Sequence, residues 1–219
     1  MVSVSQRYPR RKGRLSNEKV KAYSEAKISD FYFTSIASAI QNKKLWNPLQ
    51  IEIGFGSGEN LIYSAEQLPS QCHVGIELYI SGIASLITKK NQNQLTNLVV
   101  VQEDALEAMQ QVPDQYVSRI NIFFPDPWPK KRHHKRRLLS EAFISSCYRT
   151  LALGGLLHIA TDDRDYFGHA LQCISISSAS KGRLLHDLPA FWISRVESKF
   201  SKRAQREERE IKECFLIKQ

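Results

Sequence analysis

The sequence lacks the features that mark a secreted, metal-bound or membrane protein. Its 219 residues include only four cysteines, and no two of them form a C-x-x-C pair. No uncharged apolar run approaches the roughly 18 residues that a membrane helix needs. The first residues contain no apolar signal segment. We therefore expect reduced thiols, no bound metal, no membrane association and a cytoplasmic location.

Acidic residues are scarce in two segments in which basic residues are dense. Residues 1–27 hold eight Lys and Arg against two Glu, and residues 129–137 hold six Lys and Arg with no acid. The whole chain has a net charge of +9, so the remainder is slightly acidic. Two concentrated basic segments on such a body indicate a surface for a polyanion. The alternatives are an organelle-targeting arm for the first segment and a solvated loop for the second.

The composition is that of an ordinary folded domain, with 42% hydrophobic and 24% charged residues. A chain of this length buries a sizeable core without disulfides. We expect a flexible basic arm over residues 1–17 and a single domain over 18–219. The sequence leaves open whether the protein is a monomer or a homodimer.

Short apolar runs typical of buried strands alternate with helical patterns after residue 48. The expected strands are 49–53, 73–76, 98–101, 119–124 and 156–160. The expected helices between and after them are 59–68, 80–94, 105–111, 138–151 and 163–178. This alternation predicts an α/β fold: a doubly wound, mostly parallel sheet with helices on both faces. A helix over 18–43 is expected before it, and strand-like pieces at 191–200 and 211–217 predict an antiparallel edge.

A carboxylate stands at or just after the end of each of the five expected strands. These carboxylates belong to Glu52, Glu77, Asp104, Asp126 and Asp162. In open α/β sheets ligands bind beyond the carboxyl ends of the strands, so this edge is the expected site. Any one of the five is equally well explained as an N-cap of the following helix, but capping alone explains five in a row less well.

The first turn after a strand carries glycine at three alternate positions, Gly54, Gly56 and Gly58. Glycines let a ligand approach the backbone closely. The spacing differs from the dinucleotide pattern G-x-G-x-x-G, and the flanking Glu52 and Glu59 disfavour a phosphate. A cationic ligand without phosphates, S-adenosylmethionine, fits these charges better. Glu77 is then placed to accept hydrogen bonds from both ribose hydroxyls of that ligand. Asp104 and Ala105 are placed to contact the adenine.

The segment 123–130, FFPDPWPK, places Asp126 between two prolines. Prolines restrict the backbone, so this carboxylate is held in position on a stiff loop. The alternative is a buried Trp128 with Asp126 capping the turn. A run of basic residues and histidines follows at once, which indicates a polyanionic substrate.

These residues resemble the bacterial tRNA (guanine-N7-)-methyltransferase family. The matching stretches are RRKGRLS (10–16), IEIGFGSG (51–58), GIE (75–77), EDA (103–105), FFPDPWPKKRHHKRRL (123–138), ATD with Tyr166 (160–166) and SKFSKR (198–203). The similarity covers nearly the whole chain. It implies a class I methyltransferase, Rossmann-like fold. It also implies methyl transfer from S-adenosylmethionine, with S-adenosylhomocysteine as product, to N7 of a guanine at position 46 in the variable loop of tRNA.

The resemblance also implies roles for individual residues. The donor is implied to bind Glu52, Glu77, Asp104 and Asp126 beside the glycines and Ala105, and Asp126 is implied to be catalytic. Substrate contacts are implied for Lys130, Asp162, Ser198, Lys199, Phe200 and Ser201. Contacts with the tRNA backbone are implied for Arg132, His133, His134, Lys135, Arg136 and Arg137.

One motif departs from the family pattern, which usually reads Thr-Lys-(Phe or Tyr)-Glu followed by an Arg-Gly pair. Ser201 stands where the glutamate is usual, and Ala204 stands where the glycine is usual. Two alternatives stay open. One is another S-adenosylmethionine-dependent methyltransferase that modifies a nucleobase exocyclic amine. The other is a catalytically weakened, RNA-binding paralogue.

Overall fold

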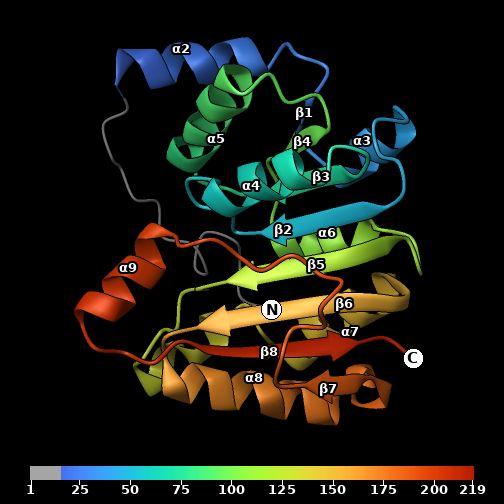
Figure 1. The fold of residues 1–219 in the computed structure, drawn as a ribbon, viewed down its shortest axis with the longest axis vertical. Helices are drawn as coiled ribbons and strands as arrows, with labels where there is room; N and C mark the ends of the chain where they lie inside the picture. The colour runs from blue at the N-terminus through green and yellow to red at the C-terminus, as the bar shows by residue number, and fades with distance from the viewer. Residues whose placement is uncertain (1–15) are drawn as a thin grey trace.

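A computed structural model of the chain describes residues 16–219 (Figure 1). One sheet runs through the molecule, and its strands lie side by side in the order β1-β4-β3-β2-β5-β6-β8-β7. The strands are β1 (Tyr32–Phe33), β2 (Leu49–Ile53), β3 (Cys72–Ile76), β4 (Leu98–Val101), β5 (Val117–Phe123), β6 (Leu151–Thr161), β7 (Arg183–Leu185) and β8 (Lys212–Ile217). Neighbouring strands from β1 to β6 pair in parallel, whereas β8 pairs antiparallel with β6 and β7. The chain order reverses between β2 and β5, which is the switch point of a doubly wound sheet.

Helices cover both faces of the sheet (Figure 1). The helices are α2 (Asn17–Ala26), α3 (Ile36–Gln41), α4 (Glu59–Gln67), α5 (Ile80–Gln92), α6 (Ala105–Gln111), α7 (Glu141–Thr150), α8 (Arg164–Ile176) and α9 (Lys199–Arg206). Two short 3₁₀ helices are η1 (Lys131–Arg136) and η2 (Ser178–Lys181). The front face in Figure 1 carries α2, α4 and α5, and the rear face carries α3, α6, α7 and α8. The expected fold class is therefore confirmed.

The core is divided unequally between the two faces. The larger apolar cluster lies behind the sheet, where β2, β5 and β6 contribute Ile51, Ile120 and Ile159. The smaller cluster lies in front, where Tyr32 of β1 and Leu98 and Val100 of β4 pack against side chains of α2, α4 and α5. Because burying one such side chain contributes about 1.5–3 kcal/mol, the rear layer supplies most of the hydrophobic stabilisation.

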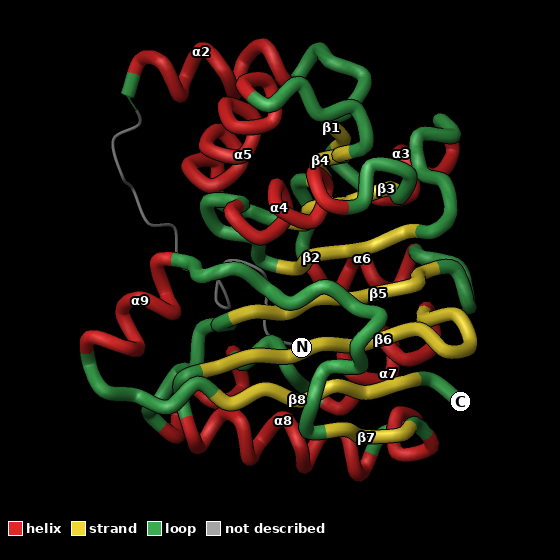
Figure 2. Tube along the Cα trace, viewed as in Figure 1, coloured by secondary structure: helices red, strands yellow, loops and turns green. Residues whose placement is uncertain are grey.

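The front face of β2, β5 and β6 is polar. The side chains that point forward from these strands include Gln50, Glu52, Arg119, Asn121 and His158, and all five are buried. Apart from α4, whose Asn60 contacts Glu52, no helix of residues 16–219 covers them on this side. Instead a segment without regular structure, residues 186–198, crosses the front of β8, β6 and β5 (Figure 2). We call this segment the strap; it leads directly into α9.

The five strands expected between residues 49 and 160 are confirmed, with β6 starting at Leu151 instead of Leu156, and the helices from α4 to α8 begin and end near the predicted positions. Two expectations are wrong. A single helix over 18–43 does not form, because Tyr32 and Phe33 pair with Val100 and Val101 of β4 and a new helix starts at the N-cap Ser35. Strand structure over 191–200 does not form either, since those residues belong to the strap and α9. The short strand β7 was not predicted.

The expected basic arm over 1–17 falls almost wholly outside the described residues. Ser16 and Asn17 are described, as the N-cap and first residue of α2, and the Ser16 hydroxyl accepts a hydrogen bond from the Lys19 amide. Within residues 16–219, no helix is both long enough and apolar enough to span a bilayer.

We expect His73 on β3 to make the protein less stable in mild acid. Burial lowers the pKa of His73 to about 4, and its Nε2 lies 3.2 Å from the Leu68 carbonyl oxygen. As pH falls below 6.5, the ordinary pKa of histidine, His73 is protonated in the unfolded chain but stays neutral in the folded chain. The free energy of unfolding therefore falls with pH in this window, by up to about 2 kcal/mol between about pH 7 and pH 5.

Urea unfolding of the wild type and of His73→Gln at both pH values measures this contribution. The other titrating groups are common to both proteins, so they cancel in the comparison. We expect the pH-dependent loss to be smaller in His73→Gln; equal losses would show that His73 is not its source.

Candidate active site

A cleft opens at the carboxyl ends of β2, β3 and β5, on both sides of the switch point. Its volume is about 610 Å³. Its walls come from the glycine turn after β2, the start of α5, the loop after β5, and α9. Of the predicted site residues the cleft is lined by Gly54, Gly56, Glu77, Ala105, Asp126, Arg136, Asp162, Lys199 and Phe200. Those that the structure does not bring to its wall are Glu52, Gly58, Asp104, Lys130, Arg132, His133, His134, Lys135, Arg137, Ser198 and Ser201.

The glycine turn needs glycine for two different reasons. Gly54, Gly56 and Gly58 all have positive φ, in the left-handed region that disfavours other residues. Gly56 faces the cleft, and its carbonyl oxygen would lie 2.3 Å from a Cβ added at Gly82 of α5. At Gly58 an added Cβ would lie 2.5 Å from Leu86 Cδ1. Gly58 therefore serves the packing of the turn against α5, and Gly54 and Gly56 open the backbone to the cleft.

Glu77 stands at the end of β3 with its carboxylate fixed by backbone amides. Oε1 accepts hydrogen bonds from the N–H of Leu78 (2.8 Å) and Tyr79 (3.1 Å), and Oε2 accepts one from Gly56 (3.2 Å). Burial raises the pKa of Glu77 against the effect of these bonds, and the nearby charge of Asp126 raises it further. The carboxylate is oriented before any ligand arrives, and it still has lone pairs for donors in the cleft.

Glu52 lies on the polar front face of β2, beneath the cleft. It is 4% exposed, and its Oε2 accepts a hydrogen bond from the Asn60 side-chain amide at 2.8 Å. Burial raises the pKa of Glu52 to about 7. The geometry thus gives this carboxylate a partner on α4, away from the cleft wall.

Two adjacent acidic residues, Glu103 and Asp104, follow β4, and their side chains make different contacts. Asp104 is the N-cap of α6, with Oδ1 accepting from the Leu106 amide (2.9 Å) and the Glu107 amide (3.3 Å). Glu103, which was not singled out from the sequence, lines the cleft, and its Oε2 accepts from the Ile36 amide at 2.9 Å. The capping alternative is therefore the geometry seen for Asp104, and Ala105 takes the predicted place in the cleft.

The loop after β5 places Asp126 at the cleft on an unusual backbone. Phe124 and Trp128, on either side of it, both have positive φ, at 50° and 45°. For large side chains this conformation costs about 1–3 kcal/mol each, so the surroundings must hold it. The Phe124 amide donates to the Ala160 carbonyl (2.8 Å) and the Pro127 carbonyl accepts from Arg137 Nε (2.8 Å). Asp126 itself is exposed.

Arg137 is a support of this loop, which corrects its predicted contact with RNA. Its guanidinium is buried over the Tyr166 ring, 5.0 Å from the centroid, and forms an ion pair with Asp165 at 2.5 Å. The reason is positional, since Arg137 follows η1 and faces the loop rather than the solvent. The exposed basic residues of η1 are Lys131, Arg132 and Lys135. Arg136 instead packs on the Trp128 ring at 4.9 Å, at the edge of the cleft.

Helix α9 forms the opposite rim of the cleft. Phe200 is 41% exposed and lies nearly parallel to Phe124, with ring centroids 6.1 Å apart. Ser198 and Ser201, predicted to contact substrate, form a capping box instead. The Ser201 hydroxyl accepts from the Ser198 amide (2.7 Å), and the Ser198 hydroxyl accepts from the Ser201 amide (3.3 Å). Ser201 and Ala204 are both buried.

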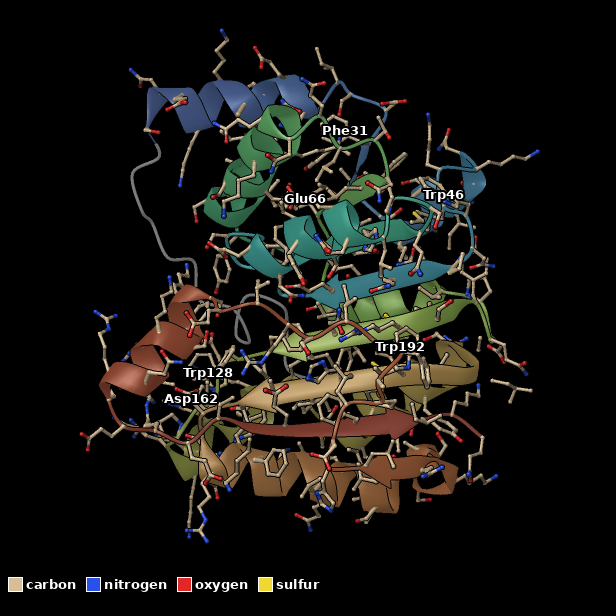
Figure 3. The ribbon with its side chains drawn as sticks, viewed as in Figure 1. Phe31, Trp46, Glu66, Trp128, Asp162 and Trp192 are labelled. Carbon is tan, nitrogen blue, oxygen red and sulfur yellow. The ribbon has the colours of Figure 1, made fainter. Side chains whose placement is uncertain are left out.

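Several charged residues in the cleft were not anticipated. Lys19, Arg203 and Arg209 line it, and Arg209 forms an ion pair with Asp162 at 2.9 Å. Figure 3 shows Asp162 near Trp128 below α9, and both belong to the same cleft. The dense basic residues of 199–209 were the available sequence signal. An open cleft with carboxylates inside and cations at its rim suits a cationic cofactor and a polyanionic substrate.

Comparisons with known proteins agree with this arrangement. A putative methyltransferase family model matches residues 46–214. The tRNA (guanine-N(7)-)-methyltransferase of Methylococcus capsulatus is 39% identical over 165 residues, which cover 73% of this chain and 70% of that one. The enzyme of the same name from Buchnera aphidicola is 41% identical over 160 residues, 71% of this chain. That alignment spans 66% of the Buchnera protein, just under two thirds of its length.

Solved structures show the same fold at low sequence identity. The 16S rRNA methyltransferase KamB has a TM-score of 0.59 at 15% identity, covering 84% of this chain and 94% of that one. A putative methyltransferase from Streptococcus mutans in complex with SAH has a TM-score of 0.52 at 10% identity, covering 80% and 90%. Fold and cleft together define a class I methyltransferase. Within that class, the chain belongs to the tRNA (guanine-N(7)-)-methyltransferase family.

The distinction between Arg137 and Arg132 is testable. We expect Arg137→Met to lower the free energy of unfolding by about 1–3 kcal/mol, because the partly buried Pro127 carbonyl loses its donor and the loop loses its support. Arg132→Met, at an exposed position of η1, is expected to change it by less than about 0.5 kcal/mol. Denaturant unfolding measures both. Equal effects of the two substitutions would contradict the structural role of Arg137.

Proposed function

We propose that this protein transfers a methyl group from S-adenosylmethionine to N7 of a guanine in tRNA, at position 46 of the variable loop. The observation that carries the proposal is the position of Asp126. Its carboxylate stands at the mouth of a carboxylate-lined cleft, on a loop that continues directly into the basic η1. This joins a place for a cationic methyl donor to a surface for a polyanion. The proposal includes a cytoplasmic location, where tRNA is found.

The cleft residues fit the methyl donor. Glu77 presents a fixed carboxylate to the two ribose hydroxyls, and Ala105 offers an apolar surface to the adenine beside Glu103. Gly54 and Gly56 leave room for the amino-acid part of the donor against the backbone. When bound, this cofactor supplies a methyl group activated by a positively charged sulfur. Glu52 and Asp104 are proposed to act on the donor indirectly, through the glycine turn and through the start of α6.

The chain needs no general base, because guanine N7 already carries an in-plane lone pair. Its task is positioning and electrostatics. Asp126 is proposed to accept hydrogen bonds from the guanine N1–H and amino group, which favours the positive charge that the base acquires on methylation. Phe200, with Phe124 behind it, offers an aromatic surface on which the base stacks. Lys199 and Asp162 border the same space.

The tRNA backbone is proposed to contact the exposed residues of η1 together with Lys130, His133 and His134. In the protein without RNA, partial desolvation and the neighbouring Arg136 and Arg132 lower the pKa of His133. Identifying the methylated nucleoside in the product separates methylation at N7 from methylation of an exocyclic amine. Tight binding of tRNA and donor with no transfer would identify a catalytically weakened paralogue.

We expect Asp126→Ala to reduce kcat for methyl transfer by at least about 10²–10³, since a charge aimed at the developing cation is lost. The fold is expected to persist because Asp126 is exposed. Glu66→Ala, an exposed acid on α4, is the matched control and should keep wild-type activity. The measurement is transfer of labelled methyl to unmodified tRNA, followed by identification of the nucleoside. Near-wild-type turnover of Asp126→Ala would refute its catalytic role.

We expect tRNA binding to weaken steeply with salt, because cations of η1 displace counterions from phosphates. Replacing Lys131, Arg132 and Lys135 by Ala is expected to reduce the slope of log affinity against log salt by about 2. The control replaces Lys43, Lys181 and Arg183, three exposed cations at the other end of the strands, and should leave the slope unchanged. Equal slopes for the two triple variants would exclude η1 from phosphate contact.

A further inference from the structure

Three nearly consecutive residues of the strap are bound to polar side chains of the sheet and α4: Arg119 and Asn60 are buried, and Glu213 is partly buried. The Ile193 carbonyl accepts from Arg119 at 2.8 Å. The Arg195 guanidinium donates twice to Glu213 Oε1, at 2.8 and 3.0 Å. The Val196 amide donates to Asn60 Oδ1 at 3.2 Å. These bonds lie immediately before Ser198, the N-cap of α9, so they hold the chain in place just before that helix begins.

The first two anchors share one network. Arg119 is 2% exposed and donates to Asn121 Oδ1 (2.8 Å) and His158 Nδ1 (3.1 Å) as well as to the strap. A guanidinium only donates, so His158 Nδ1 is the acceptor and its Nε2 carries the proton that goes to Glu213 Oε2 at 2.6 Å. The bonding pattern thus fixes a neutral His158. Trp192 of the strap covers Arg119, 5.5 Å from ring centroid to guanidinium (Figure 3).

The third anchor is different because it reaches the donor side of the cleft. Asn60 is the second residue of α4, directly after the glycine turn. It is 7% exposed, and it has one partner on each side: Nδ2 donates to Glu52 and Oδ1 accepts from the strap. Asn60 has no part in the proposed reaction. Its side-chain amide nevertheless connects the start of α4, directly after the glycine turn, to the strap that leads into Lys199 and Phe200.

We propose that Asn60 is a positioning residue that holds the strap against α4, so that α9 keeps Lys199 and Phe200 over the cleft for the incoming guanosine. The inference rests on the proposed function for the identity of the substrate. The quantity that Asn60 is inferred to change is the fraction of protein molecules in which the strap is correctly placed for RNA binding. If the strap is correctly placed only part of the time, the apparent affinity for RNA falls by that fraction, whereas turnover of bound RNA is retained.

The test compares Asn60→Ala with Asn97→Ala in the full chain. Asn97 is an equally buried asparagine whose Nδ2 donates to the Ala65, Leu68 and Gln71 carbonyls at the far end of α4. Both variants lose buried hydrogen bonds, so both lose stability. Only Asn60→Ala is expected to speed amide hydrogen exchange across the strap and α9 in the free protein. It is also expected to raise KM for tRNA about three- to tenfold, with kcat within about twofold.

An unchanged KM with a lower kcat in Asn60→Ala, or strap exchange equal to that of Asn97→Ala, would overturn the inference and leave Asn60 with stability alone. Arg195→Gln, which removes the neighbouring anchor from a less buried site, is the second variant if Asn60→Ala does not fold. It should show the same exchange and KM changes, and a wild-type profile would equally overturn the inference. Failure of the wild type to methylate tRNA would instead refute the proposed function, and the exchange experiment would still decide whether Asn60 holds the strap.

Discussion

The buried guanidinium of Arg119 is the constraint on which the front half of the molecule depends. A cation in the middle of a sheet face is costly unless it is paired and fully hydrogen-bonded. Burial lowers the pKa of Arg119 to about 10, and the charges of Glu52 and Glu213 act against that shift. An apolar helix over β5 and β6 would offer no acceptors to this face. A strap of irregular backbone offers carbonyl groups, and Ile193 supplies one. The chemistry of the sheet face thus selects the segment that covers it.

The cleft follows from backbone geometry more than from any single side chain. Three left-handed glycines form the turn, two left-handed aromatic residues bracket Asp126, and amide groups orient Glu77. Conformations of this kind persist only where the surroundings enforce them. Here Arg137 ties the loop to α8 through Asp165 and the Pro127 carbonyl. The arginines and lysines of this basic run therefore divide into exposed cations, Arg136 packed on the Trp128 ring, and the buried support Arg137.

The sequence predicts this fold well where short-range pattern decides it. The strand ending at Val101 is a continuous apolar run, and the strands ending at Ile53 and Ile76 place apolar side chains at every second position; their ends locate the cleft. Prediction fails where distant pairing decides, since Tyr32 and Phe33 leave a helical pattern to join β4. It also fails at single-residue precision. Which of Glu103 and Asp104 faces the cleft depends on where α6 begins, and the alternation of Arg119 and Asn121 with Ile120 and Ile122 signals a polar face only once the sheet neighbours are known.

The departures from the family pattern at Ser201 and Ala204 lie in the support of α9 and not in its cleft face. Ser201 occupies the third helical position, where a glutamate completes the usual capping box. Its hydroxyl makes the same reciprocal bond with the Ser198 backbone and also donates to the Ser198 carbonyl at 2.9 Å. Ala204 is fully buried on the same helix. Because α9 keeps its N-terminus, Lys199 and Phe200 keep their direction into the cleft, and neither Ser201 nor Ala204 lines its wall.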